Sequence, residues 1–137
     1  MARVIGLGGV FARCSDAQAT GRWYADVLGI DLADFGGAHF RPQDFVAAYG
    51  ESAMTVWSPF GPDMHEYMEP GTAPFMINLV VDDLDGVLER ARAHGVEPVT
   101  EEPVEYDQGR FAWIVDPDGV KLELWQPGSP PISDPAS

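Results

Sequence analysis

The sequence of 137 residues has little of three things that whole classes of protein need: cysteine, positive charge and long apolar runs. Cys14 is the only cysteine, which excludes a disulfide framework and a thiolate metal cluster. We expect Cys14 to be a buried, unreactive thiol in an apolar strand rather than a nucleophile.

Positive charge is scarce, because eight Lys and Arg residues stand against 22 Asp and Glu and leave a formal net charge of −14. The cations are scattered along the chain, whereas nucleic acids and anionic membranes are bound by clustered basic residues. The composition therefore predicts no nucleic-acid partner and no membrane partner. An acidic surface favours solubility and also suits a cationic small ligand.

Long apolar runs are missing too. No stretch approaches the roughly 20 apolar residues of a membrane-spanning helix, and the first residues lack the pattern of a secretory signal. We therefore expect a cytoplasmic protein. Hydrophobic residues make up 45% and charged residues 22% of the chain, which is typical of a globular domain.

The sequence does contain a weak internal repeat. A β-rich run over 4–14 precedes a helix that Ser15-Asp16 caps and that Gly29 ends after Leu28. The same order returns with an offset of 66 positions. The second copy consists of the strand Phe75–Val81, the cap Asp82-Asp83, the helix Leu84–His94 and the stop Gly95.

Short strand-like stretches follow each helix. They are Ile30–Phe35, His39–Arg41 and Ala53–Ser58 in the first half, and Glu97–Thr100, Gly109–Val115 and Val120–Gln126 in the second. The last two flank Asp116-Pro117-Asp118-Gly119, which predicts a hairpin because Pro117 presets φ and Gly119 permits a positive φ. Each half is therefore β-α-β-β-β.

These patterns predict an α+β fold, in which paired β-α-β-β-β modules form a curved mixed sheet around a cup, with the helices outside. One domain over 1–126 would hold the modules 4–58 and 75–126, joined by the Pro- and Gly-rich segment 59–74. The tail 127–137 has four prolines and no periodicity, so we expect it to be disordered.

The order of several short motifs resembles one known superfamily. The motifs are Trp23-Tyr24…Leu28-Gly29, Val80-Val81-Asp82-Asp83-Leu84-Asp85, and Phe111-Ala112-Trp113…Asp116-Pro117-Asp118-Gly119…Leu122-Glu123-Leu124. Over about residues 4–126 the chain resembles the vicinal-oxygen-chelate superfamily of glyoxalases, bleomycin-resistance proteins and extradiol dioxygenases. The resemblance implies the paired-module fold but not one reaction, because one fold hosts many chemistries.

The resemblance also implies where a metal would be held. The ligand positions of the metal-using members fall on Gly9, Met76, Thr55 or Trp57, and Glu123. Of these only Glu123 matches, since glycine has no side chain and the others are poor ligands for a hard or borderline divalent ion. We therefore expect no metal and no cofactor.

The period of two in strands assigns the residues of the predicted cup. Glu123 shares a strand face with Lys121 and Trp125, opposite the apolar Leu122 and Leu124, and is the candidate general acid or base. The predicted ligand-binding residues are Phe11, Arg13, Thr55, Trp57, Met76, Asn78, Lys121 and Trp125. The alternatives are a solvent-facing Glu123 paired with Lys121, and Phe11 and Met76 as core residues.

The three histidines have weaker claims. His94 lies at a helix C-terminus, where the helix dipole favours it. His39 and His65 could reach over the cup and form an unusual metal site with Glu123. With Glu66, Tyr67 and Glu69 nearby, the joint 59–74 could also act as a lid.

Three functions are compatible with these features. The first is metal-free binding of a small, partly aromatic molecule, as in the drug-sequestering branch of the resembled superfamily. The second is a metal-free enzyme that uses Glu123, with Asn78 or Arg13 stabilising an oxyanion. The third is a divalent-metal-dependent lyase or dioxygenase. We expect a homodimer because the edges of a small curved sheet need covering; the modules could pair within one chain or across the dimer.

Overall fold

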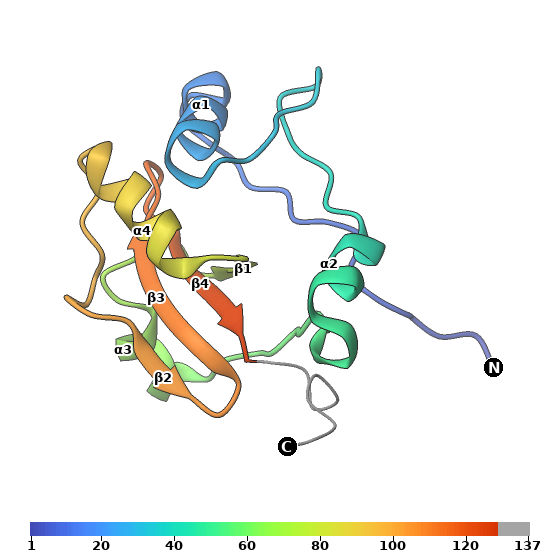
Figure 1. Cartoon of the computed structure of the whole chain (residues 1–137). Helices are drawn as coiled ribbons and strands as arrows, with labels where there is room; N and C mark the ends of the chain where they lie inside the picture. Colours follow the sequence, from blue (N-terminus) through green and yellow to red (C-terminus); the bar gives the residue numbers. More distant parts are fainter. Residues whose placement is uncertain (129–137) are drawn as a thin grey trace.

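A computed structural model describes residues 1–128 and centres on a four-stranded sheet in the order β1-β4-β3-β2 (Figure 1). Its strands are β1 (Met76–Val80), β2 (Val104–Tyr106), β3 (Gly109–Val115) and β4 (Lys121–Pro127). β4 pairs in parallel with β1 and antiparallel with β3, and β2 pairs antiparallel with β3. The predicted α+β class is thus confirmed, with a mixed sheet that does not close into a barrel.

Two helices with matching starts lie on one side of this sheet. In α1 (Ala17–Leu28) the carboxylate of Asp16 accepts from the N–H of Ala19 at 3.1 Å, and in α4 (Leu84–Ala93) Asp83 accepts from the N–H of Gly86 at 3.1 Å. The two cap residues have almost identical backbone angles, −143° and 94° against −144° and 94°. The internal repeat therefore has a structural counterpart in the two capped helices.

The core lies between these helices and the sheet. One face of the sheet buries alternate residues of β3 and β4, and α4 covers them with its apolar stripe. The buried apolar residues are Val27, Leu84, Val87, Leu88, Ala91, Ala112, Ile114, Val120, Leu122 and Leu124. Burial of a side chain of this size contributes about 1.5–3 kcal/mol, so this layer holds α4 and the hairpin together.

The hairpin between β3 and β4 forms as predicted. The N–H of Gly119 donates to the carbonyl of Asp116 at 3.1 Å, and Gly119 has a φ of +85°. The Asp116 carboxylate accepts from the N–H groups of Asp118 at 2.8 Å and Val120 at 3.0 Å. Hydrogen bonds also attach α1 to this turn, because Tyr24 donates to Asp116 and Thr20 donates to Asp118.

The prediction of strands in the first half of the chain is wrong. Segments 4–14, 30–35, 39–41 and 53–58 contain no strand. Phe11 is 95% exposed and Trp57 is 74% exposed. A strand needs a neighbouring backbone to receive its N–H and C=O groups. Segment 4–14 instead leads away from the sheet (Figure 1) and has no such neighbour within the described chain.

Helical turns occupy two regions for which the sequence predicted no helix or strand. Between 41 and 52 lie α2 (Pro42–Tyr49) and the 3₁₀ turn η1 (Gly50–Ser52), and within the joint 59–74 lie η2 (Pro62–Met64) and α3 (His65–Met68). Pro42 stands at the first helical position, where its missing N–H costs nothing.

Several bounds in the second half also differ from the prediction. β1 covers Met76–Val80 rather than Phe75–Val81, α4 ends at Ala93 rather than His94, and β4 begins at Lys121 rather than Val120. The expected strand Glu97–Thr100 is not formed, and the strand β2 lies further along at Val104–Tyr106. β4 extends to Pro127, the first residue of the expected tail, while 129–137 lie outside the described residues.

Candidate functional site

The register of the sheet gathers polar and aromatic side chains on the face opposite the core. Glu123 pairs with Asn78 of β1 on one side and with Trp113 of β3 on the other. Since paired residues point to the same face, one surface collects a set that we call the Glu123 face. Its members are Met76, Asn78, Val80, Phe111, Trp113, Val115, Lys121, Glu123 and Trp125.

The carboxylate of Glu123 is the centre of this face. Its residue is only 8% exposed, and both of its oxygens are engaged. Oε1 accepts from Nδ2 of Asn78 at 2.8 Å, while Oε2 accepts from Nε1 of Trp113 at 2.9 Å and from the hydroxyl of Tyr67. Three donors therefore satisfy a buried carboxylate that would otherwise be costly to desolvate.

Lys121 lies beside this carboxylate and is itself only 6% exposed. Its Nζ donates to the carbonyl of Tyr67 and lies 5.0 Å from the centre of the Tyr67 ring and 5.5 Å from that of Trp113. Burial lowers the pKa of Lys121, and the neighbouring Glu123 opposes that shift. The ammonium thus lies against two aromatic rings and a carbonyl oxygen.

Aromatic rings form the wall next to Glu123. Phe111 is stacked between Trp113, with ring centres 6.5 Å apart, and Trp125, at 6.1 Å. Nε1 of Trp125 donates to the carbonyl of Gln108 at 2.9 Å, and Phe45 of α2 meets Trp125 edge-on. The face therefore combines one satisfied carboxylate with a flat apolar wall, which suits a small aromatic molecule.

Strand parity predicted only part of this arrangement. It placed Lys121, Glu123, Trp125, Met76 and Asn78 on one surface, and the register has them there. We did not assign Trp113, although the same parity applied to Gly109–Val115 puts it opposite Glu123. No signal predicted that Phe45 would contact Trp125, because that contact depends on the unpredicted helix α2.

The four predicted residues of the first half lie elsewhere. Phe11, Arg13, Thr55 and Trp57 are all exposed and lie in extended segments that pair with no strand of the described chain. Within a single chain they are not part of the Glu123 face.

The residues around Glu123 do not fit a divalent cation. Its oxygens face an amide N–H, an indole N–H and a hydroxyl, and the Lys121 ammonium lies nearby, so the surroundings donate rather than accept hydrogen bonds. In the part of the chain that the structure describes, no three His, Cys, Asp or Glu side chains form a group that could hold a metal ion.

The histidines and the cysteine have other surroundings. The ring of His39 packs against Phe35 at 5.3 Å, and His65 begins α3. Nδ1 of His94 lies 3.0 Å from the carbonyl of Arg90 at the end of α4, a structural position as expected. Cys14 is half-buried rather than buried, and desolvation raises the pKa of its thiol, which keeps it unreactive.

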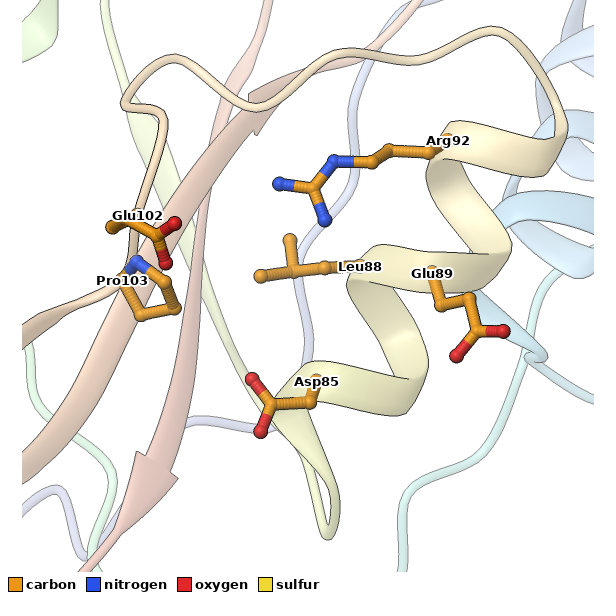
Figure 2. A pocket seen from close by; sticks show the side chains of 6 residues that line it. All are labelled: Asp85, Leu88, Glu89, Arg92, Glu102 and Pro103. Carbon is orange, nitrogen blue, oxygen red and sulfur yellow. The ribbon is translucent and has the colours of Figure 1, made fainter.

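A hollow of about 290 Å³ lies on the other side of the sheet, between α4 and the loop before β2 (Figure 2). Asp85, Leu88, Glu89 and Arg92 line it from α4, and Glu102 and Pro103 line it from the loop. Three of its side chains have structural partners. Leu88 belongs to the core, Arg110 pairs with Asp85 at 3.0 Å, and Arg92 reaches the carbonyl of Glu101. The Glu123 face is therefore the better candidate site.

Comparison with known proteins supports the family. Residues 6–124 match the model of the glyoxalase/bleomycin resistance protein/dioxygenase superfamily. This chain belongs to that superfamily. The membership agrees with the resemblance carried by the sequence motifs.

One relative with a similar sequence is the uncharacterized protein YaeR of Escherichia coli (strain K12). It is 28% identical over 115 residues, which cover 82% of this chain and 88% of YaeR. A glyoxalase/dioxygenase from Nostoc punctiforme has a TM-score of 0.52 at 17% identity, covering 94% of this chain and 99% of its own. TnmS3, an antibiotic binding protein from Streptomyces sp. CB03234, has a TM-score of 0.49 at 24% identity, covering 83% and 88%.

No helix within residues 1–128 of this superfamily member is both long enough and apolar enough to cross a membrane.

Proposed function

We propose that this chain binds a small, partly aromatic organic molecule on the Glu123 face, without a metal or cofactor. The observation that carries the proposal is the buried carboxylate of Glu123, surrounded by three donors and a wall of Trp113, Phe111 and Trp125. The stacked rings supply apolar contact to a ligand, and the polar carboxylate fixes how the ligand is oriented. A cytoplasmic location accompanies this function as a further prediction.

Binding is favoured over catalysis as the basic activity. A general base needs a free lone pair directed at the proton that it removes. In Glu123 both oxygens already accept hydrogen bonds from Asn78, Trp113 and Tyr67. Catalysis by Glu123 would require that one of these donors leaves first, which makes it the second candidate.

Two measurements on the whole chain test this function. The first is calorimetric titration with small aromatic compounds, comparing the unchanged protein with Glu123→Gln. We expect binding in the unchanged protein that the substitution weakens; no binding by any compound would contradict the proposal. Loss of turnover of a bound compound with its affinity retained would instead assign Glu123 a catalytic role.

The second measurement addresses the metal. The metal content of untagged protein is determined by mass spectrometry, together with melting temperatures after addition of Fe²⁺, Mn²⁺, Ni²⁺ or Zn²⁺. An ion that binds the folded state raises its melting temperature by mass action. We expect no stoichiometric ion and no upward shift. A bound ion would replace this proposal with the metal-dependent lyase or dioxygenase.

We further propose that the working form is a homodimer whose modules pair across the two chains. Large apolar side chains in 4–14 and 53–58 are exposed, among them Phe11 at 95% and Trp57 at 74%. β1 has a free edge in the described chain, because it pairs only with β4. Each chain thus offers both unpaired strand-like segments and a sheet edge that needs covering.

The position of α1 favours pairing with a second chain over pairing within one. Both the N–H and the hydroxyl of Ser15 bond the carboxylate of Asp118 at 3.1 Å, which fixes the end of segment 4–14 at the hairpin turn. From there the segment leads away from its own sheet (Figure 1). In such a dimer Phe11, Arg13, Thr55 and Trp57 of the second chain would complete the cup. A sedimentation mass equal to one chain would contradict this arrangement.

A further inference from the structure

One residue of the chain already occupies the Glu123 face in the way a ligand would. The hydroxyl of Tyr67 donates to Oε2 of Glu123, and the Tyr67 ring meets the Trp113 ring edge-on, with centres 6.2 Å apart and planes at 88°. The Lys121 ammonium lies 5.0 Å from the centre of the same ring. A half-buried phenol is therefore bound by a carboxylate, an indole and a cation at once.

The segment that carries Tyr67 is weakly attached to the sheet. We call residues 60–71 the strap; its helical turns η2 and α3 contain three and four residues. Helices this short are marginal without tertiary support. Within residues 1–128, the hydrogen bonds between strap and sheet are those of Tyr67, from its hydroxyl to Glu123 and from Lys121 to its carbonyl.

Space around the strap is consistent with this weak attachment. A hollow of about 380 Å³ is lined by strap residues and by Ala73 and Pro74. It borders Phe60, Met64 and Met68, so the strap is not packed on all sides. Movement of the strap therefore breaks few hydrogen bonds to the sheet.

We propose that Glu123, Trp113 and Lys121 form a phenol-binding position that Tyr67 fills when no ligand is present, and that the ligand is a hydroxylated aromatic molecule. This rests on the proposed function of the Glu123 face and names the class of molecule that it takes. The ligand displaces Tyr67, donates its own hydroxyl to Glu123 and releases the strap.

The chemistry of the position selects against other classes. A carboxylate acceptor requires that the ligand donate a hydrogen bond, and it repels an acidic ligand. The Lys121 ammonium favours an electron-rich ring and disfavours a cationic ligand. A neutral phenol meets all four demands. Burial, and next the bond to Glu123, raise the pKa of Tyr67, so the position favours the protonated hydroxyl.

The experiment compares 2-naphthol, 2-methoxynaphthalene and naphthalene by calorimetric titration into the full chain and three variants. Tyr67→Phe keeps the ring but removes the competing hydroxyl. Since it weakens the occupant rather than the site, we expect 2-naphthol to bind this variant about five- to tenfold more tightly than the unchanged protein. Glu123→Gln is expected to weaken 2-naphthol about tenfold or more. Glu89→Gln, the same change at an exposed position on α4, is the matched control with no change.

The outcomes separate this inference from the proposed function. Equal affinity for all three probes would overturn the phenol class but leave aromatic binding intact. No binding of any probe to any variant would overturn both. An unchanged or lower affinity of Tyr67→Phe for 2-naphthol would show that Tyr67 is a wall of the site and not its occupant.

Hydrogen exchange on the unchanged protein gives a second test that needs no substitution. Saturation with 2-naphthol is expected to speed amide exchange within 64–69, because displaced helical turns lose their protection, while β3 stays protected. Slower exchange within 64–69 would overturn displacement of the strap.

Discussion

Three donors from three separate segments converge on the carboxylate of Glu123. Asn78 comes from β1, Trp113 from β3 and Tyr67 from the strap. A neutral amide at this position has one acceptor oxygen, and its NH₂ group would face donors. Glu123 therefore contributes to the stability of the fold.

We expect Glu123→Gln to lower the free energy of unfolding by about 2 kcal/mol, because hydrogen bonds to a buried charged group are lost or left unmade. Urea denaturation monitored by circular dichroism measures the change. Glu89→Gln, an exposed change on α4, is the matched control and should differ little from the unchanged protein. Equal stability of the two variants would contradict the role assigned to the three bonds.

Asp118 links the turn of the hairpin to α1. Its carboxylate accepts from the N–H and the hydroxyl of Ser15 at 3.1 Å and from the hydroxyl of Thr20 at 2.8 Å. The backbone bond from Ser15, followed by the bond from Thr20, lowers the pKa of Asp118. A lowered carboxyl pKa stabilises the fold above the ordinary aspartate pKa of about 4, and that contribution is lost as the pH falls through the lowered value.

We therefore expect Asp118→Asn to melt at a lower temperature than the unchanged protein at pH 7, and the gap to close as the pH falls toward 3. Melting curves across this range measure it. Asp26→Asn, exposed on α1, provides the comparison. A gap that stays constant with pH would show that the charge of Asp118 does not stabilise the link.

The residues of the Glu123 face could be predicted from strand parity because the period of two does not depend on tertiary context. Asn78 and Trp125 were placed correctly in this way. The bond from Tyr67 could not be predicted, since it depends on the path of a Pro- and Gly-rich segment without periodicity. Strand parity cannot assign side chains to a face in a segment that forms no strand, which is why the prediction for Phe11 and Trp57 is wrong.

At the scale of elements, local signals predicted the two capped helices and the last hairpin closely. The N-caps Asp16 and Asp83, the end of α1 at Gly29 and the turn of the β3–β4 hairpin lie at the predicted residues, because capping and turn formation depend on neighbouring side chains. The first-half strands failed for the opposite reason. Their pattern is suited to a sheet, but in the described chain no neighbouring strand pairs with them.

Two glycines with positive φ allow the turn and its surroundings to be tested separately. Gly119 has a φ of +85°, and a Cβ there would lie 2.1 Å from Oγ1 of Thr72. Gly95 has a φ of +80° and open space around it. The carbonyl of Gly119 also accepts from the N–H groups of Thr72 and Ala73, which ties the joint to the hairpin.

We expect Gly95→Ala to cost about 1 kcal/mol, the strain of a left-handed alanine, and Gly119→Ala to cost clearly more because the clash with Thr72 adds to the same strain. Chemical denaturation of the two variants measures the difference. Equal costs would mean that the segment around Thr72 moves aside freely.

For the whole molecule, the exposed apolar segments predict how the chains associate. Val56, which is 67% exposed in segment 53–58, lies in the proposed interface. Val99, which is 39% exposed and lies next to β3, is outside it. A charge at an interface position prevents burial, while a charge at a position that stays exposed costs little.

We expect Val56→Asp to convert a dimer into single folded chains and Val99→Asp to remain dimeric. Sedimentation velocity gives the masses, and circular dichroism confirms that both variants are folded. The unchanged protein should also melt at a temperature that rises with its concentration, as a dimer does. A dimer that persists in Val56→Asp would place the interface elsewhere.

Lys121 is the only lysine in the chain, and it lies 6% exposed between Tyr67 and Trp113. Apart from the terminal amine, a reagent that acylates amines therefore has one target, and that target is covered while Tyr67 stays in place. The rate at which Lys121 gains a single acyl group, followed by mass spectrometry of the intact protein, therefore measures how often the strap opens. A saturating ligand that removes Tyr67 but seats its own ring under the ammonium would change that rate, so the chain carries its own reporter for occupancy of the site.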